Sequence, residues 1–143
     1  VNVSKRIVKS PKIYFRDSGL LHRLNSIDDF ECLQGNFIIG SSWEGYVIEQ
    51  VFQHLPDDYF LCYYRTHHGA EIDLIIAKGI RPLYCLEIKY SNTPVISKGY
   101  YETISDLKTK NNFVITPGCS KWEDKKNNIV YCSLETFIKE DLR

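Results

Sequence analysis

The sequence lacks most of the features that assign a chain to a class at first reading. Its formal net charge is zero, so the chain as a whole has no electrostatic attraction for nucleic acid. Any such binding has to come from a local patch. No apolar run approaches the roughly 20 residues that cross a bilayer, and no signal peptide is recognisable. We therefore expect no membrane contact and a cytoplasmic location.

The five cysteines are odd in number and widely spaced, and none forms a C-x-x-C pair. This spacing argues against a zinc site. Cys62 and Cys85 lie within apolar segments, where we expect buried thiols. Unpaired, scattered cysteines are typical of a reduced intracellular compartment.

Methionine is absent, and so is a phosphate-binding loop of the G-x-x-x-x-G-K-[ST] type. Without an initiator residue, we expect the chain to be a segment of a longer protein. Residues 1–11 are polar and basic, as in a linker from an upstream module. The remainder, 12–143, has the size and the 43% hydrophobic content of one globular domain. No ATP binding is expected from this segment alone.

Periodicity and turn residues predict an α/β fold. The expected elements are a strand over 12–15, a short helix over 19–24, a loop with one helical turn over 25–40, a helix over 41–55, strands over 59–65, 71–77 and 83–90, a helix over 97–110, a strand over 112–116, a loop over 119–127, a strand over 128–132 and a last helix over 134–141. Consecutive strands followed by a helical crossover imply a mixed β-sheet flanked by helices, in the core order α-β-β-β-α-β.

Acidic side chains recur on the two strands on either side of the turn at 78–82. Because strand side chains alternate between faces, Glu87 and Lys89 share a face, and a hairpin would bring Asp73 opposite them. The other face of the first strand is then expected to carry its apolar residues, Ile72, Leu74 and Ile76. A second interpretation is that the polar residues simply mark the solvated face of an antiparallel sheet.

Glu44 stands in an unusual place on the helix predicted over 41–55. It falls inside an apolar arc formed by Trp43, Val47, Ile48, Val51, Phe52 and Leu55. Ser41 and Glu44 have capping-box spacing, which would explain the carboxylate structurally. Alternatively, the helix packs on the sheet and directs Glu44 towards Asp73 and Glu87.

Glu44 on a helix, Asp73 on a strand and the Glu87-Ile88-Lys89 tripeptide on the next strand together resemble the PD-(D/E)XK nuclease superfamily. The resemblance implies a restriction-endonuclease-like fold that hydrolyses phosphodiester bonds of DNA, as an endonuclease or exonuclease. Asp73, Glu87 and Glu44 would bind Mg²⁺ or Mn²⁺, with Lys89 at the attacking water. Ile72 stands where the family name has proline, a departure that the family often tolerates.

A wider set of blocks is similar to a narrower group. Residues 10–21, Trp43-Glu44, 69–73 and 87–89 resemble, in this order, the nuclease-like C-terminal domain of prokaryotic AAA-type ATPases. The similarity covers roughly residues 8–115. It implies that the partner of this domain is an ATPase module of the same full-length chain.

The chemistry can also be argued from the residues. Hard carboxylate oxygens suit Mg²⁺, and one or two such ions stabilise the attacking and leaving oxygens at a phosphate. Without a cation, crowded carboxylates repel each other, and the pKa of at least one should rise. Lys89 would relieve part of this repulsion.

Three functions remain open from the sequence. The domain is a Mg²⁺-dependent nuclease, or the same fold retained as a binding or regulatory module with little turnover, or a structural domain with a solvated acidic face. The sequence does not settle the oligomeric state.

Other polar residues have both a structural and a functional interpretation. His67 and His68 are typical of an exposed turn, but could contact a phosphate, and Glu71 is expected at the sheet margin. The loop over 119–127 is expected to be solvated, although its lysines and aromatic ring could hold a nucleic-acid backbone. These loop residues are Lys121, Trp122, Lys125 and Lys126.

Overall fold

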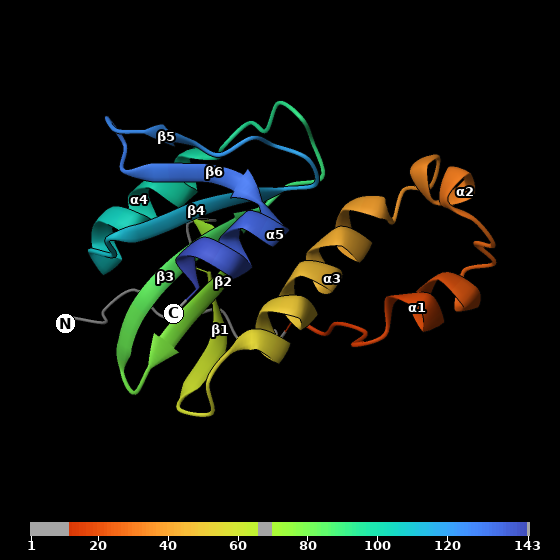
Figure 1. Ribbon diagram of the computed structural model, residues 1–143, viewed down its shortest axis with the longest axis horizontal. Helices are drawn as coiled ribbons and strands as arrows, with labels where there is room; N and C mark the ends of the chain where they lie inside the picture. The colour runs from red at the N-terminus through yellow and green to blue at the C-terminus, as the bar shows by residue number, and fades with distance from the viewer. Residues whose placement is uncertain (1–11, 66–69, 143) are drawn as a thin grey trace.

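A computed structural model describes residues 12–65 and 70–142. Figure 1 shows a twisted six-stranded sheet with helices packed on it and a helical extension, α1 and α2, reaching beyond the sheet. The strands are β1 (Tyr59–Arg65), β2 (Glu71–Lys78), β3 (Arg81–Ile88), β4 (Asn111–Thr116), β5 (Trp122–Asp124) and β6 (Ile129–Ser133). The helices are α1 (Ser18–Leu24), α2 (Phe30–Gln34), α3 (Ile39–His54), α4 (Lys98–Leu107), α5 (Leu134–Thr136) and the π-helical η1 (Phe137–Asp141).

The sheet has the order β1-β2-β3-β4-β6-β5 and mixes both kinds of pairing. β1, β2 and β3 are antiparallel neighbours, β3, β4 and β6 are parallel, and β5 lies antiparallel on β6. The parallel step from β3 to β4 requires a crossover, which α4 supplies. The predicted α/β class, mixed sheet and core element order are confirmed.

Each face of the sheet carries its own apolar core. On one face α3, α5 and η1 pack on alternate residues of the central strands, around Leu74, Ile76, Leu86, Ile115 and Phe137. On the other face α4 packs through the fully buried Tyr100 on Ile72, Ile75, Cys85 and Val114. This two-sided burial is the expected arrangement for strands with a parallel centre, because their crossover helices cover both faces.

A β-bulge interrupts the alternation of β2. Cys62 pairs with Ile75, but Tyr64 pairs with Ile72, so β2 has one residue more than β1 between these pairs. The prediction that Ile72 shares a face with Leu74 is therefore wrong, and Ile72 lies in the α4-side core with Ile75. Asp73 and Leu74 occupy the bulge, a feature that redirects side chains and is common beside active sites.

Helix α4 is held close to the sheet. The side chain of Ser97 accepts a hydrogen bond from the backbone N–H of Tyr100 and caps the helix. A Cβ on Gly99 would lie 2.7 Å from the Cα of Ala70, so only glycine permits this approach. The Tyr100 hydroxyl then lies 3.1 Å from the carbonyl oxygens of both Cys85 and Phe113, which ties the helix to β3 and β4.

Several predicted elements are corrected. Residues 12–15 form no strand, because this extended segment lies against α3 through its side chains and joins no ladder among the described residues. The region 25–40 contains α2 and the start of α3, and 119–127 contains β5. Helix α4 ends at Leu107 rather than 110, since Lys108 adopts a left-handed conformation with φ 54°.

Two further predictions about burial are wrong for single side chains. Cys85 is buried as predicted, but Cys62 is exposed on the edge strand β1. Phe52, assigned to the apolar arc of α3, is 52% exposed.

The predicted linker over 1–11 and the turn residues His67 and His68 lie outside the described residues. Within residues 12–65 and 70–142, no helix is both long and apolar enough to cross a membrane.

Candidate functional site

The four candidate residues lie on α3, on β2 and at the end of β3, and one of them, Lys89, contacts two of the others directly. Lys89 follows the last residue of β3, and its Nζ lies 2.7 Å from Glu87 Oε1 and 3.7 Å from Asp73 Oδ2. The backbone N–H of Lys89 donates to Ile115 O at 3.0 Å, which extends the β3–β4 pairing and holds Lys89 in place. The hairpin thus brings Asp73, Glu87 and Lys89 together, as the alternation predicted.

Asp73 lies in the bulge of β2 and is only 8% exposed. Its Oδ2 accepts a hydrogen bond of 3.0 Å from the backbone N–H of Ile88 on the neighbouring strand. A buried carboxylate without such donors would be costly, so this bond both compensates its burial and orients it. The other oxygen, Oδ1, faces the Lys12 ammonium at 3.4 Å.

Glu87 is the most deeply buried carboxylate of the group, at 4% exposed. Burial, and then the charge of Asp73, raise the pKa of Glu87 to about 7 against the opposing effect of Lys89. Burial alone would lower the pKa of Lys89, but its hydrogen bond with Glu87 and the charge of Asp73 raise it overall. The site therefore keeps Lys89 charged and carries more negative charge than it compensates.

Glu44 is directed towards the sheet and does not cap its helix. α3 begins at Ile39 with no side-chain cap, and Ser41 donates to the backbone oxygen of Ile38. Glu44 instead accepts from the Tyr14 hydroxyl at 2.5 Å and from Lys12 Nζ at 3.1 Å. The capping-box interpretation is wrong because α3 starts two residues earlier than predicted.

Lys12 links Glu44 to the strand residues. Its Nζ lies 2.6 Å from Glu71 Oε1, 3.1 Å from Glu44 Oε1 and 3.4 Å from Asp73 Oδ1. Burial alone would lower the pKa of the Lys12 ammonium, but the hydrogen bond to Glu71 and the charges of Glu44 and Asp73 raise it overall. Glu71 does begin β2, at the margin where it was expected, yet it also belongs to this cluster.

Sequence reasoning missed the roles of Lys12 and Tyr14, which it placed on a short strand. These residues are two apart in an extended segment and so point to the same side. That spacing was the only signal, and it did not indicate what the segment would pack against. The contacts of residues 14–16 with α3 show how this segment is held.

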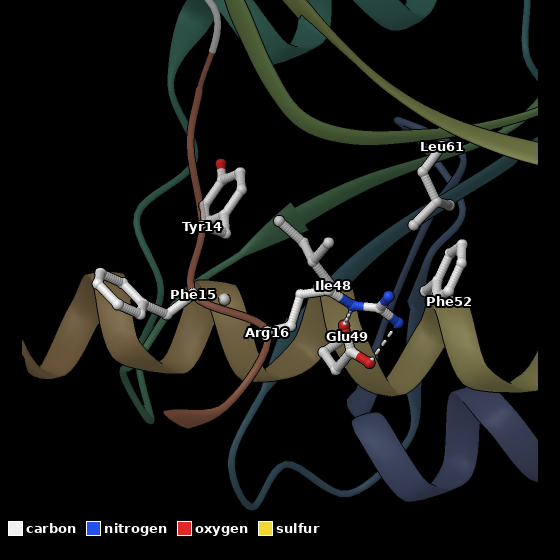
Figure 2. A pocket seen from close by; sticks show the side chains of 8 residues that line it. Tyr14, Phe15, Arg16, Ile48, Glu49, Phe52 and Leu61 are labelled. Atoms are coloured by element: carbon white, nitrogen blue, oxygen red, sulfur yellow. Dashed lines mark hydrogen bonds and ion pairs between the residues drawn. The ribbon is translucent and has the colours of Figure 1, made fainter. Parts of the chain in front are cut away.

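Figure 2 shows residues 14–16 crossing α3, where they line one side of a mainly apolar hollow. Arg16 makes a two-pronged ion pair with Glu49, at 2.8 and 2.9 Å, and its guanidinium lies 4.7 Å from the ring centre of Phe52. A Cβ on Gly45 would lie 3.7 Å from the Tyr14 ring, an ordinary van der Waals contact, so the segment passes close to α3 at this residue. The segment is anchored to α3 on one side and to the acidic cluster on the other.

The donor set fits a divalent cation in charge and chemistry. Four carboxylates (Glu44, Glu71, Asp73, Glu87) against two ammonium groups (Lys12, Lys89) and the Arg65 guanidinium, which lies 3.7 Å from Glu71 Oε2, leave a formal charge of −1 when all are ionised. All the acidic donors are oxygen, the ligand type that Mg²⁺ and Mn²⁺ prefer. Among the residues the structure describes, no three His, Cys, Asp or Glu side chains are arranged to hold an ion directly. Instead, the Lys12 ammonium lies between three of the carboxylates.

In the lysine-rich loop over 119–127, one lysine makes ion pairs that stabilise the structure. Lys121 pairs with Glu140 at 3.0 Å and with Asp141 at 2.9 Å. The Trp122 ring stacks on Tyr131 with ring centres 3.9 Å apart, and it remains 51% exposed. Lys121 therefore ties β5 to the C-terminal helix, which favours the structural interpretation for that residue.

The fold and site define an α/β domain with a mixed six-stranded sheet and an acidic cluster at the β2–β3 hairpin. The chain belongs to the family described as "Domain of unknown function (DUF4143)", whose model matches residues 39–137. That range contains all four candidate residues and leaves out the segment with Lys12 and Tyr14.

Two mycobacterial proteins resemble the chain. They are the uncharacterized protein Rv2008c of Mycobacterium tuberculosis and the uncharacterized protein Mb2031c of Mycobacterium bovis, each 44% identical over 117 residues. These matches cover 82% of this chain and 26% of each relative, so the chain spans about a quarter of the length of these curated relatives. No solved structure matches it.

Proposed function

We propose that this domain binds Mg²⁺ or Mn²⁺ and hydrolyses phosphodiester bonds of DNA, in the manner of the PD-(D/E)XK nucleases. The observation that carries the proposal is the contact of Lys89 with both Asp73 and Glu87 at one point of the hairpin, with Glu44 of α3 joined to Asp73 through Lys12. The same residues were the ones that the resemblance singled out. A buried group of acids with a formal negative excess is unfavourable unless a cation is used.

Each residue has a role that follows from its surroundings. Asp73 and Glu87 would be the main metal ligands, and Glu44 would bind directly or through water. The Ile88 N–H holds one Asp73 oxygen in a fixed direction, which preorganises the ligand. Lys89, charged and next to both acids, would orient the attacking water and stabilise charge at the phosphate.

The metal, when bound, supplies neutralisation of the phosphate and a lower pKa for its bound water. A metal ion would stabilise the ionised form of Glu87, because a nearby positive charge opposes the effects of burial and of Asp73 that raise the pKa of Glu87. The neutral overall charge of the chain means that DNA has to be held near this site by local contacts.

A second candidate is the same fold acting as a binding or regulatory module of a longer protein. The Lys12 ammonium among the carboxylates favours it, since the cluster is already partly compensated without a metal. The relatives are about four times longer than the matched part, which leaves room for another module. Following the sequence resemblance, we propose that this module is an AAA-type ATPase in the same chain.

Calorimetric titration with Mn²⁺ and Mg²⁺ tests the metal site. The variant Asp73→Asn keeps the side-chain shape and an acceptor for the Ile88 N–H but removes the charge, so it should abolish binding. Glu102→Gln on α4 removes a charge from a side chain that is 56% exposed and should bind as the parent does. Equal binding by the Asp73→Asn variant would place the metal elsewhere and sink the proposal.

Digestion of plasmid and oligonucleotide DNA then separates the two candidates. Metal-dependent cleavage that disappears in Asp73→Asn supports a nuclease. Metal binding without cleavage supports the binding or regulatory module. Cleavage that persists in Asp73→Asn identifies a contaminating enzyme, and absence of metal binding leaves a structural domain with an acidic face.

A further inference from the structure

The Lys12 ammonium occupies the kind of position that a metal ion would take. It lies within 2.6 to 3.4 Å of one oxygen from each of Glu71, Glu44 and Asp73. Its side chain is 24% exposed, so it is drawn into the cluster rather than extended into water. Of the Asp73 oxygens, Oδ1 is the one turned to Lys12, while Oδ2 is taken up by the Ile88 N–H and Lys89.

We propose that residues 12–16 form a latch whose Lys12 ammonium stands in for a divalent cation and must withdraw before the metal is fully bound. This inference rests on the proposed function, because it concerns regulation of the same site. An ammonium group and a divalent ion a few ångströms apart repel strongly in a half-buried site. The two cations therefore compete for the same carboxylates.

The latch is attached in a way that permits release. Within the described residues, its backbone belongs to no helix or strand, so its departure would not break the sheet. It is held by side chains: Tyr14 donates to Glu44, and Arg16 pairs with Glu49 of α3. Within the described residues Arg16 pairs with Glu49 and not with the acids that hold Lys12, yet it fixes the segment that carries Lys12.

Withdrawal of Lys12 from the cluster would increase the net negative charge of the site and with it the affinity for a metal ion. With Lys12 in place, two ammonium groups and the Arg65 guanidinium oppose four carboxylates, and without it Lys89 and Arg65 remain. A segment that withdraws thus converts a partly compensated cluster into one with a larger negative excess. A DNA strand or another part of a longer protein that draws the segment away would switch the site towards metal binding.

The test measures metal affinity, which does not depend on turnover. Calorimetry with Mn²⁺ is carried out on the parent chain, Lys12→Gln and the matched control Lys98→Gln. Lys98 lies on α4 and its side chain is 91% exposed, so its loss removes the same charge at a remote place. We expect Lys12→Gln to bind Mn²⁺ about tenfold more tightly or better, and Lys98→Gln to match the parent.

A second variant keeps the proposal testable if Lys12→Gln does not fold. Arg16→Gln removes an anchor without touching the acids, and we expect a smaller gain in Mn²⁺ affinity. Limited trypsin digestion gives an independent readout: Mn²⁺ should expose the Lys12–Ile13 bond and speed cleavage there. The rate should not respond to Mn²⁺ in Asp73→Asn, which controls for effects of the ion on the protease.

The outcomes separate this inference from the proposed function. Mn²⁺ binding by the parent, with equal or weaker binding by both Lys12→Gln and Arg16→Gln, would overturn the latch and leave the metal site standing. Absence of Mn²⁺ binding in every variant would overturn both. Tighter binding in Lys12→Gln that is lost when Asp73→Asn is added supports both.

Discussion

The buried carboxyl of Glu87 should impose a pH dependence on folding that Glu87→Gln removes. The pKa of Glu87 is raised from 4.5 to about 7, first by burial and then by the charge of Asp73. The folded chain therefore keeps a proton on Glu87 in a pH range where the unfolded chain has released it. Linkage then requires the free energy of unfolding to fall as pH rises from about 4.5 to about 7, and to level off above that range.

The size of the effect follows from the shift and from the burial of the group. The shift is about 2.5 pH units, and each unit corresponds to about 1.4 kcal/mol, so the effect is about 3 kcal/mol. Glu87 is only 4% exposed, so solvent screening reduces this figure little. Lys89, 2.7 Å away, already opposes the shift, and the Gln side chain keeps an oxygen that can accept its hydrogen bond.

Urea unfolding followed by circular dichroism, in a chelator and at several values from about pH 5 to about pH 8, measures the effect. Near pH 5 the parent and Glu87→Gln should be similar in stability, because the parent carboxyl is protonated. Near pH 8 the variant should be the more stable by up to about 3 kcal/mol. Glu102→Gln, at an exposed position on α4, should follow the parent throughout. A difference between parent and Glu87→Gln that stays constant with pH would refute the reasoning.

Two further predictions concern the helices that position the site, and both are measured as changes in the free energy of unfolding. Ser97→Ala should cost about 1 kcal/mol, because the Ser97 hydroxyl accepts a hydrogen bond of 3.2 Å from a backbone N–H of α4. Ser41→Ala should cost less than about 0.5 kcal/mol, because Ser41 caps no helix. Equal losses in the two variants would contradict the assigned helix starts. Gly99→Ala should destabilise by about 1–3 kcal/mol, because its Cβ would meet the Ala70 backbone at 2.7 Å. Gly40→Ala should be neutral or stabilising by up to about 1 kcal/mol, because Gly40 lies in α3 and a Cβ there would have no atom within 4 Å. A loss of stability similar to that of Gly99→Ala would show that packing against Ala70 is not the cause of the Gly99 effect.

The sequence alone determined the features that depend on near neighbours in the chain. Alternation placed Glu87 and Lys89 on one face and predicted a hairpin that brings Asp73 to them, and the structure has these contacts. Helical crossover logic predicted the mixed sheet, because a parallel β3–β4 pair needs a connection such as α4. The predicted start of the last helix at 134 is also confirmed, since the side chain of Ser133 just before it accepts the Thr136 N–H.

Only the tertiary structure decided how these elements complete the site. The bulge that holds Asp73 depends on how β1 pairs with β2, and the alternation of β2 by itself does not reveal it. Lys12 meets Glu44 across 32 positions and Asp73 across 61, distances over which no local periodicity carries information. The choice between helix cap and site residue for Glu44 likewise depended on where α3 begins and on what packs against it. Local spacing fixes which side of its own element a residue points to, whereas packing between elements decides which charges meet.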